Sequence, residues 1–389
     1  MKRIGILLTA GPGGGTFQYT QTLLDAALAL PRDQYKLVAA YVDPLWLDEL
    51  PPDVERFQLR DSAWDRALNK AWHFTRLPMS AWRKTAARLD SNIRALMAQD
   101  CDLWLCPGNE RYAFRAPVPA LGTVHDLMHR YESSFREVSD DGEYERREFH
   151  FKETCRWAKA VVVDSELGKR QLHESYGISL DRVFVLPYIA PRYVRETSKT
   201  DATFDSRYRL PEKFFFYPAQ FYSHKNHRGL VEAIAMMKDS HPDVRLVLVG
   251  AIERNGYEGL RGLIAERGLT EHIQFLGYVP DSDMAGLYNR ARALVMPTFF
   301  GPTNIPPLEA FAAGAPAATS DIYAVRDQLG DAALLFDPRS TEQIRNTLVQ
   351  LWTDDVLCAD LVARGRKHAE NWGQPQFNAR LAEIVGMII

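Results

Sequence analysis

The sequence predicts an α/β protein with two doubly wound, Rossmann-like halves. Short apolar segments alternate with stretches of helical period along almost all of its 389 residues. Several of these segments are apolar at consecutive positions, which is typical of strands buried on both faces of a parallel sheet. A polar stretch with a proline at each end, residues 191–211, interrupts the alternation once. We therefore expect two domains with about six strands each.

The expected strands are short runs rich in Val, Ile, Leu and Phe. They are 4–8, 37–41, 103–105, 121–124, 160–163 and 183–186 in the first half, and 214–217, 245–249, 273–275, 293–296, 317–319 and 333–336 in the second. Amphipathic stretches such as 17–30 and 230–237 separate them as helices. The expected domains are 1–195 and 205–370, with a C-terminal helix at 371–389 that packs back toward the first. Ligands of such sheets bind beyond the carboxyl ends of the strands, so two facing halves would share a cleft.

Composition and charge exclude several classes of protein. Lys and Arg number 47 against 50 Asp and Glu, a net charge of −3, so the chain lacks the basic excess of a dedicated nucleic-acid binder. Its apolar runs are all shorter than the roughly 20 residues that cross a bilayer. The four cysteines, Cys101, Cys106, Cys155 and Cys358, form no metal-binding or disulfide pattern. We expect a cytoplasmic protein, in peripheral contact with the inner face of the membrane at most.

Two strand-to-helix connections are candidate anion sites. The first strand leads into Gly11–Thr16, whose glycines let backbone N–H groups approach an anion at a helix start, although a tight turn explains them equally well. In the second half, strand 214–217 is followed by Gln220, Lys225 and Asn226. Asn226 is the expected N-cap, and Lys225 would meet a phosphate beside the positive end of the helix. A solvated loop lysine is the alternative.

Residues 297–310 are the most informative segment. A loop leads from a strand into Pro306 and Pro307, which suit the first turn of a helix because they lack an N–H. Glu309 falls in that turn, where its carboxylate could accept from two neighbouring hydroxyls. Free N–H groups at Thr303 to Ile305 would meet a diphosphate. Simple charge pairing at a helix start is the alternative for Glu309.

His125 follows strand 121–124 directly. A histidine at the carboxyl end of a parallel strand occupies the position of a ligand-facing group, although a structural histidine is the alternative. We expect Asp126 to orient His125 or to cap the next turn. Asp281-Ser282-Asp283 matches the DxD pattern of metal-dependent sugar transfer, but it opens a helical pattern, so helix capping explains it without a metal.

Taken in order, these motifs resemble a GT-B fold glycosyltransferase of the large retaining family 4. The matching segments are the glycine loop near Gly14, His125-Asp126, Asp164-Ser165-Glu166, Lys225-Asn226, Phe275-Leu276-Gly277-Tyr278 and Pro307-Leu308-Glu309-Ala310. The resemblance implies a nucleotide-sugar donor held mainly by the C-terminal domain, an acceptor domain at the N-terminus, and no metal or other cofactor.

The resemblance also implies roles for individual residues. Lys225 would bind the donor diphosphate, Tyr278 would lie beside the base, and Glu309 would hold the ribose hydroxyls. His125 would lie under the transferred sugar, so that the catalytic set is His125, Lys225 and Glu309. The other expected donor contacts are Gly14, Gly15, Gln220, Thr303, Asn304 and Ile305.

The sequence departs from the family pattern at two positions. Gly301 stands where the family has a sugar-contacting glutamate, eight positions before Glu309, and Thr303 or Asn304 would take over its contacts. Gln220 stands where many relatives have an arginine, which leaves more of the diphosphate charge to Lys225. The stretch Gly301–Glu309 is similar to bacterial polysaccharide mannosyl- and rhamnosyltransferases, which favours a GDP-linked mannose or rhamnose.

The expected function is therefore retaining transfer of a hexose to a glycan or lipid-linked glycan in bacterial surface polysaccharide (lipopolysaccharide) synthesis. Two alternatives remain: a nucleotide-sugar epimerase on the same fold, and a non-catalytic partner subunit. Residues 67–99 are basic and carry Trp72, Phe74 and Trp82 among cations that include Arg76. This segment predicts either peripheral contact with an anionic membrane or a solvated helix face with buried tryptophans.

Overall fold

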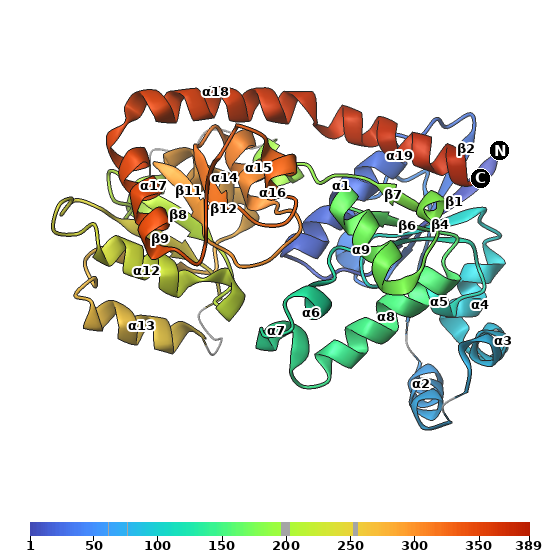
Figure 1. Ribbon diagram of the computed structural model, residues 1–389. Helices are drawn as coiled ribbons and strands as arrows, with labels where there is room; N and C mark the ends of the chain where they lie inside the picture. The colour runs from blue at the N-terminus through green and yellow to red at the C-terminus, as the bar shows by residue number, and fades with distance from the viewer. Residues whose placement is uncertain (61, 76, 196–202, 252–255) are drawn as a thin grey trace. The chain divides into compact units, whose positions relative to one another are not determined.

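The computed structural model describes all residues except 61, 76, 196–202 and 252–255 (Figure 1). It contains two compact units that do not follow the order of the chain. The first consists of Met1–Leu127, Tyr144–Pro187 and Gln374–Ile389. The second consists of Met128–Glu143 and Tyr188–Gly373. Residues 128–143 thus pack with the C-terminal half of the sequence, and residues 374–389 pack with the N-terminal half.

The first unit contains a parallel sheet of seven strands in the order β3-β2-β1-β4-β5-β6-β7. Its strands are β1 (Lys2–Leu8), β2 (Tyr35–Tyr41), β3 (Glu55–Gln58), β4 (Leu103–Cys106), β5 (Ala120–Thr123), β6 (Ala160–Val163) and β7 (Val183–Val185). Six of the seven coincide with predicted strands. The exception is β3, an edge strand that pairs only through β2 and has no fully buried residue. A strand of this kind lacks the apolar run on which the prediction depended.

Helices of the first unit cover the sheet and its ends. They are α1 (Gly15–Leu28), α2 (Ala63–Thr75), α3 (Met79–Leu89), α4 (Ser91–Ala98), α5 (Tyr112–Arg115), α8 (Glu143–Trp157), α9 (Glu166–Tyr176) and α19 (Gln374–Ile388), with short 3-10 turns at Pro44–Leu47 and Leu180–Arg182. The last helix, α19, lies against α1, where the rings of Tyr19 and Phe377 are 6.5 Å apart. Asp164 and Ser165 follow β6, and the Ser165 hydroxyl caps α9 by accepting from the N–H of Gly168.

The second unit contains a parallel sheet of six strands in the order β10-β9-β8-β11-β12-β13. The strands are β8 (Phe215–Pro218), β9 (Leu246–Val249), β10 (Ile273–Gly277), β11 (Ala293–Met296), β12 (Ala317–Ser320) and β13 (Leu334–Phe336). All six coincide with predicted strands. The predicted doubly wound α/β class is therefore confirmed for both halves of the chain.

Helices lie on both faces of the second sheet (Figure 1). The helices of the second unit are α6 (Met128–Tyr131), α7 (Arg136–Ser139), α10 (Arg192–Arg195), α11 (Phe204–Tyr208), α12 (His227–Ala235), α13 (Gly256–Glu266), α14 (Asp281–Arg290), α15 (Pro306–Ala313), α16 (Val325–Leu329), α17 (Thr341–Thr353) and α18 (Asp355–Asn371), with a 3-10 turn at Ser223–Lys225. Phe215 and Tyr217 pack with α12, α13 and α17, while Phe214 and Phe216 pack with α14, α15 and α16. Burial of alternate residues on opposite faces explains why these strands are apolar at every position.

None of the helices in the described part of the chain combines the length and the hydropathy needed to cross a bilayer.

Candidate functional site

The strand order of each sheet identifies where its ligand should bind. In doubly wound sheets the ligand lies beyond the carboxyl ends of the strands where the strand order reverses. This point falls between β8 and β11 in the second unit and between β1 and β4 in the first. Most candidate residues taken from the sequence follow these strands, while His125 follows β5 and Tyr278 follows β10, so each unit contains a candidate half-site of its own.

In the second unit, the turn that carries Lys225 follows β8. The strand itself fixes the backbone of this turn, because the hydroxyl of Tyr217 donates to the carbonyl of Lys225 at 2.9 Å. Asn226 adopts a left-handed conformation with φ of 54° and caps α12, its Oδ1 accepting from the N–H of Gly229 at 3.1 Å. Its Nδ2 donates to the carbonyl of Pro338 at 2.9 Å. The predicted N-cap is confirmed, and Lys225 stands immediately before the positive end of a helix.

The loop after β11 leads into α15 as predicted, with Pro306 and Pro307 in the first turn. Gly301 has φ of 125°, a conformation that side chains rarely adopt. A Cβ atom at this position would lie 2.8 Å from Oδ1 of Asn304. The backbone of this loop therefore disfavours the glutamate that the family pattern has at position 301.

Glu309 is buried in the first turn of α15, with 7% of its surface exposed. The Tyr193 hydroxyl donates to Oε1 at 2.6 Å, and the Tyr288 hydroxyl donates to Oε2. Burial raises the pKa of the Glu309 carboxyl above its ordinary value, although the two hydroxyls oppose this shift. The two tyrosines were not identified from the sequence, because they come from α10 and α14, far away along the chain.

The expectation of free N–H groups at Thr303 to Ile305 was wrong for Asn304. Its N–H donates to Oε1 of Gln328 at 2.9 Å, and Nε2 of Gln328 donates back to the Asn304 carbonyl at 2.8 Å. Nδ2 of Asn304 is buried and has no hydrogen-bond partner among the described atoms. The buried side chain of Asn304, rather than its backbone, is thus the polar group left for a ligand.

Two further expected donor contacts follow two strands of the same sheet, β10 and β8. Tyr278 follows β10 and is 75% exposed, so its ring can receive a planar group. Gln220 follows β8 and is exposed, with its Oε1 accepting from the N–H of Ala251 at 3.3 Å.

In the first unit, the glycine loop follows β1 and ends at the start of α1. Gly14 is the N-cap residue with φ of 80°, and both Gly14 and Gly15 are exposed. A side chain at Gly14 would be strained, which explains the glycine without a ligand and also leaves the helix start open to an anion.

His125 follows β5 and is fixed by its surroundings. Its Nε2 donates to the carbonyl of Pro107 at 3.1 Å, and its ring lies edge-on to Tyr19 at 5.0 Å. Burial lowers the pKa of His125 below its ordinary value, which favours the neutral ring. Asp126 accepts from Arg147 at 3.0 Å.

Glu110, which follows β4, is a residue of this half-site that sequence reasoning missed. The residue is 6% exposed, and its carboxyl group accepts from the Thr9 hydroxyl at 3.0 Å and from the N–H of Gly108 at 2.8 Å. Burial raises the pKa of Glu110 to about 7. The signal that could have identified it is its place after a strand at the reversal of strand order, because such positions carry ligand-facing groups.

Asp281 and Asp283 lie in the first turn of α14, where the helix dipole favours acidic side chains, but the Asp283 carboxylate does not cap the helix. Oδ2 of Asp283 accepts instead from Arg207 at 2.9 Å and from the Tyr208 hydroxyl. The DxD pattern therefore opens a helix as expected, and its second aspartate joins α14 to α11. Within the described residues, no group of three or more His, Cys, Asp or Glu side chains is arranged to hold a metal ion.

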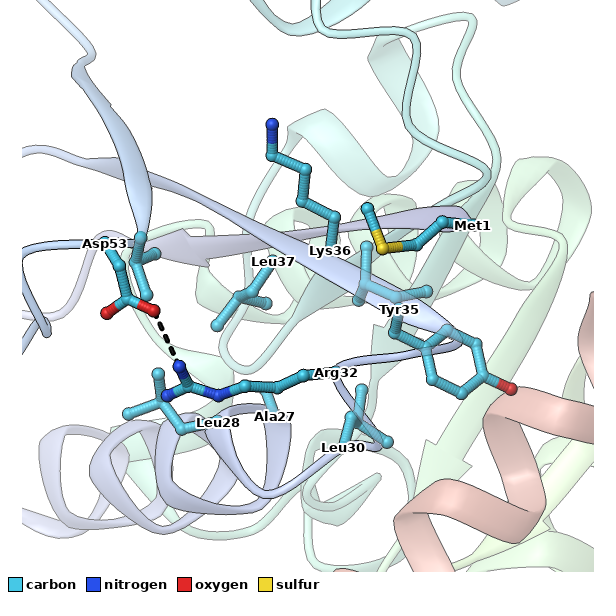
Figure 2. A pocket seen from close by; sticks show the side chains of 11 residues that line it. Met1, Ala27, Leu28, Leu30, Arg32, Tyr35, Lys36, Leu37 and Asp53 are labelled. Atoms are coloured by element: carbon cyan, nitrogen blue, oxygen red, sulfur yellow. Dashed lines mark hydrogen bonds and ion pairs between the residues drawn. The ribbon is translucent and has the colours of Figure 1, made fainter.

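A cavity of about 250 Å³ in the first unit lies at the opposite edge of its sheet, beside the amino ends of β1 and β2. Figure 2 shows Arg32 and Asp53 on one side of it, joined by an ion pair of 2.6 Å. Because parallel sheets bind ligands at the carboxyl ends of their strands, we do not include this cavity in the candidate site.

Two doubly wound parallel sheets, with candidate residues near both reversals of strand order, give the chain the GT-B fold. Residues 198–368 match the family model described as glycosyl transferases group 1. The matched residues lie in the second unit, within Tyr188–Gly373, and this part of the chain belongs to the group 1 glycosyl transferases.

Two curated relatives that carry the name mannosyltransferase are similar to this chain. O-antigen chain mannosyltransferase B of Escherichia coli is 26% identical over 260 residues, which are 63% of this chain and 68% of that protein. The serotype-specific mannosyltransferase WbdA of Escherichia coli is 25% identical over 224 residues, 56% of this chain and only 28% of that longer protein.

Two solved structures share the fold along the whole chain. Sucrose-phosphate synthase from Thermosynechococcus elongatus has a TM-score of 0.76 at 20% identity and covers 100% of this chain and 99% of its own. Anabaena HepE in complex with UDP and glucose has a TM-score of 0.74 at 16% identity and covers 99% and 100%.

Proposed function

We propose that this glycosyltransferase moves a hexose of the mannose or rhamnose type from a nucleotide sugar, GDP-linked by preference, to a glycan or lipid-linked glycan. The product would be a bacterial surface polysaccharide, and the configuration at the anomeric carbon would be retained. The O-antigen mannosyltransferase relative supports the sugar and the pathway. The HepE complex with UDP supports a nucleoside diphosphate as the leaving group.

One observation carries the proposal. Strands β8 and β11 are paired neighbours, and the Lys225 turn and the start of α15 follow them at the reversal of strand order. A lysine, two helix starts and the buried carboxyl of Glu309 are thereby brought to one sheet edge of one unit. The lysine and helix starts suit a diphosphate, and the carboxylate suits ribose hydroxyls.

The atoms and charges of the transfer reaction balance without a cofactor. The bond between the anomeric carbon and the diphosphate oxygen breaks, and the anomeric carbon bonds to the acceptor hydroxyl oxygen. The acceptor proton passes to an oxygen of the departing nucleoside diphosphate. Lys225 stabilises the charge that develops on this leaving group, and electrostatic stabilisation of this kind is usually the largest single contribution to enzyme catalysis.

In the first unit, we assign His125 to the face of the transferred sugar as a neutral hydrogen-bonding group. Its lowered pKa and its fixed ring suit this role. Gly14 and Gly15 remain candidate phosphate contacts through their backbone N–H groups.

We also propose that residues 67–99 contact an anionic membrane surface, which would present a lipid-linked acceptor. Trp82 is buried, and Trp72 packs against it with ring centroids 5.8 Å apart, so the tryptophans form core rather than a membrane-facing surface. The membrane contact therefore relies on exposed cations, which are Lys70, Lys84, Arg88 and Arg94. Arg76 and the side chain of Phe74 lie outside the described residues.

The experiment that tests the proposed function measures melting temperatures with GDP, UDP, dTDP and ADP, because a ligand that binds the folded state raises them. The nucleotide that binds is then offered as its mannose and rhamnose donors together with glycan acceptors. Transfer with GDP-mannose or a rhamnose donor supports the proposal. Isomerisation of the donor alone would indicate the epimerase, and absence of both binding and turnover would indicate a non-catalytic subunit.

A further inference from the structure

Residues 128–143 form a segment that packs on the loops of the second unit. Met128 and Val138 are buried in one cluster with Phe300, and Phe135 stacks on the ring of Phe299 at 5.6 Å. A second anchor is the Tyr323 hydroxyl, which donates to Oε1 of Glu132. The segment begins three residues after His125 along the chain, yet it contacts the loops that follow β8 and β11.

Within this segment, Glu137 binds the turn that carries Lys225. Its carboxylate accepts from the Ser223 hydroxyl at 2.8 and 2.9 Å and from the His224 N–H at 3.1 Å. Nδ1 of the His224 ring lies 3.1 Å from the same carboxylate. One carboxylate thus takes up the donors of both residues that precede Lys225, and its side chain is only 15% exposed.

The His224 ring extends this network to the second loop. It stacks on Phe300 with centroids 3.9 Å apart and an interplanar angle of 11°. The His224 carbonyl accepts from the N–H of Phe299 at 2.7 Å and from the Thr298 hydroxyl at 3.1 Å. These contacts therefore join the Lys225 turn to the Phe300-Gly301 loop. Glu137, which belongs to neither segment, holds the turn through its carboxylate.

We propose that Glu137 is a positioning residue for the donor diphosphate: its carboxylate orders the Ser223–Lys225 turn and so sets where the Lys225 ammonium is presented. This inference rests on the proposed function. A turn held by three charge-assisted hydrogen bonds is preorganised, so less ordering is needed when the diphosphate binds. Loss of the carboxylate charge should weaken diphosphate binding but leave the binding of the nucleoside unchanged.

The test measures the affinity of the full chain for GDP and guanosine by calorimetry, or for the diphosphate and nucleoside selected by the melting-temperature panel. Glu137→Gln should raise the Kd for GDP by about tenfold and leave the Kd for guanosine unchanged. The donor KM should rise in parallel while the acceptor KM stays constant. Glu137→Asp, which keeps the charge, should recover part of the affinity.

Glu132→Gln is the matched control, because Glu132 anchors the same segment through Tyr323 rather than through the turn. Equal losses in both variants, or equal losses for GDP and guanosine, would show a merely structural role and overturn the inference. If Glu137→Gln destabilises the fold, Ser223→Ala removes a donor of the same carboxylate at an exposed position. Ser223→Ala should also weaken the binding of GDP without weakening the binding of guanosine. An unchanged affinity for GDP in this variant would overturn the inference.

The same measurements separate this inference from the proposed function. A wild-type chain that binds none of the nucleoside diphosphates contradicts the proposed function itself. The role of Glu137 alone is contradicted if the wild type binds GDP, the Lys225→Ala variant does not, and the Glu137→Gln variant binds GDP as tightly as the wild type.

Discussion

The Tyr193 hydroxyl lies 2.6 Å from Oε1 of Glu309, and it comes from a helix 116 positions earlier in the chain. Together with Tyr288 it fixes both carboxylate oxygens of the residue assigned to the ribose. A carboxylate has about four acceptor positions, so each oxygen can still accept one ligand hydroxyl. The two tyrosines thus orient Glu309 without occupying all of its acceptor capacity.

Glu309→Ala should weaken the binding of GDP by about 1.5–3 kcal/mol, the usual contribution of hydrogen bonds to a charged group. The sharper measurement is calorimetry with both GDP and its 2′,3′-dideoxy analogue. If Glu309 binds the ribose hydroxyls, the analogue should bind wild type and variant equally. A variant that loses the same free energy with both ligands would remove Glu309 from the ribose site.

The local features around these residues could be predicted from the sequence because they depend on neighbours along the chain. The N-cap of Asn226 and the helix start at Pro306 and Pro307 are of this kind, and so are strands that are apolar at every position. Features that depend on distant contacts could not be predicted. The edge strand Glu55–Gln58 has no apolar run, and Tyr193 reaches Glu309 only through the fold.

The segment 128–143 also depends on distant contacts, and these decide to which of the two units it belongs. Its sequence position places it in the N-terminal half, but Phe135 and Val138 pack with Phe300 of the second unit. No local pattern encodes such a partner. Glu110 was missed for another reason, because a lone glutamate after Asn109 belongs to no motif and only the strand order gives it significance.

Lys225→Met should lower the transfer rate by about 10²-fold or more, since the departing diphosphate loses its nearest assigned cation. The variant keeps the length and apolar stem of the side chain, so the turn should remain folded. Lys238→Met is the matched control, because it removes a positive charge just beyond the other end of α12. Comparable turnover numbers for the two variants would contradict the role of Lys225.

Gly301→Ala should destabilise the protein by about 1–3 kcal/mol, the cost of a side chain in a backbone conformation reserved for glycine. The new Cβ would also press on the Asn304 side chain, so donor binding should fall as well. Gly259→Ala is the control, because this helical glycine of α13 has open space around it and the substitution should be neutral or stabilising by about 0.5–1 kcal/mol. Urea unfolding of the two variants checks both expectations. Equal stability of Gly301→Ala and the wild type would mean that the loop accepts a side chain and that the family's glutamate could be restored.

Glu110→Gln should change how stability depends on pH. The pKa of Glu110 is raised from an ordinary value of 4.5 to about 7 by burial, so the folded state keeps a proton that the unfolded chain has already lost. The stability that this group contributes is fully present below pH 4.5 and is lost as the pH rises to about 7. Glutamine does not titrate, and it can still accept from Gly108 and donate to Thr9, so the variant does not suffer this loss.

The free energy of unfolding should therefore be similar for wild type and Glu110→Gln at pH 5 and should diverge in favour of the variant up to pH 8. The full difference is about 3 kcal/mol, because each pKa unit is equivalent to about 1.4 kcal/mol. Urea unfolding at pH 5, 6, 7 and 8 measures it, and comparison with the wild type cancels the other titrating groups. A difference that stays constant across this range would mean that Glu110 is ionised in the folded protein throughout, and the buried carboxyl group would then be an acceptor for the first half-site rather than a proton-bearing group.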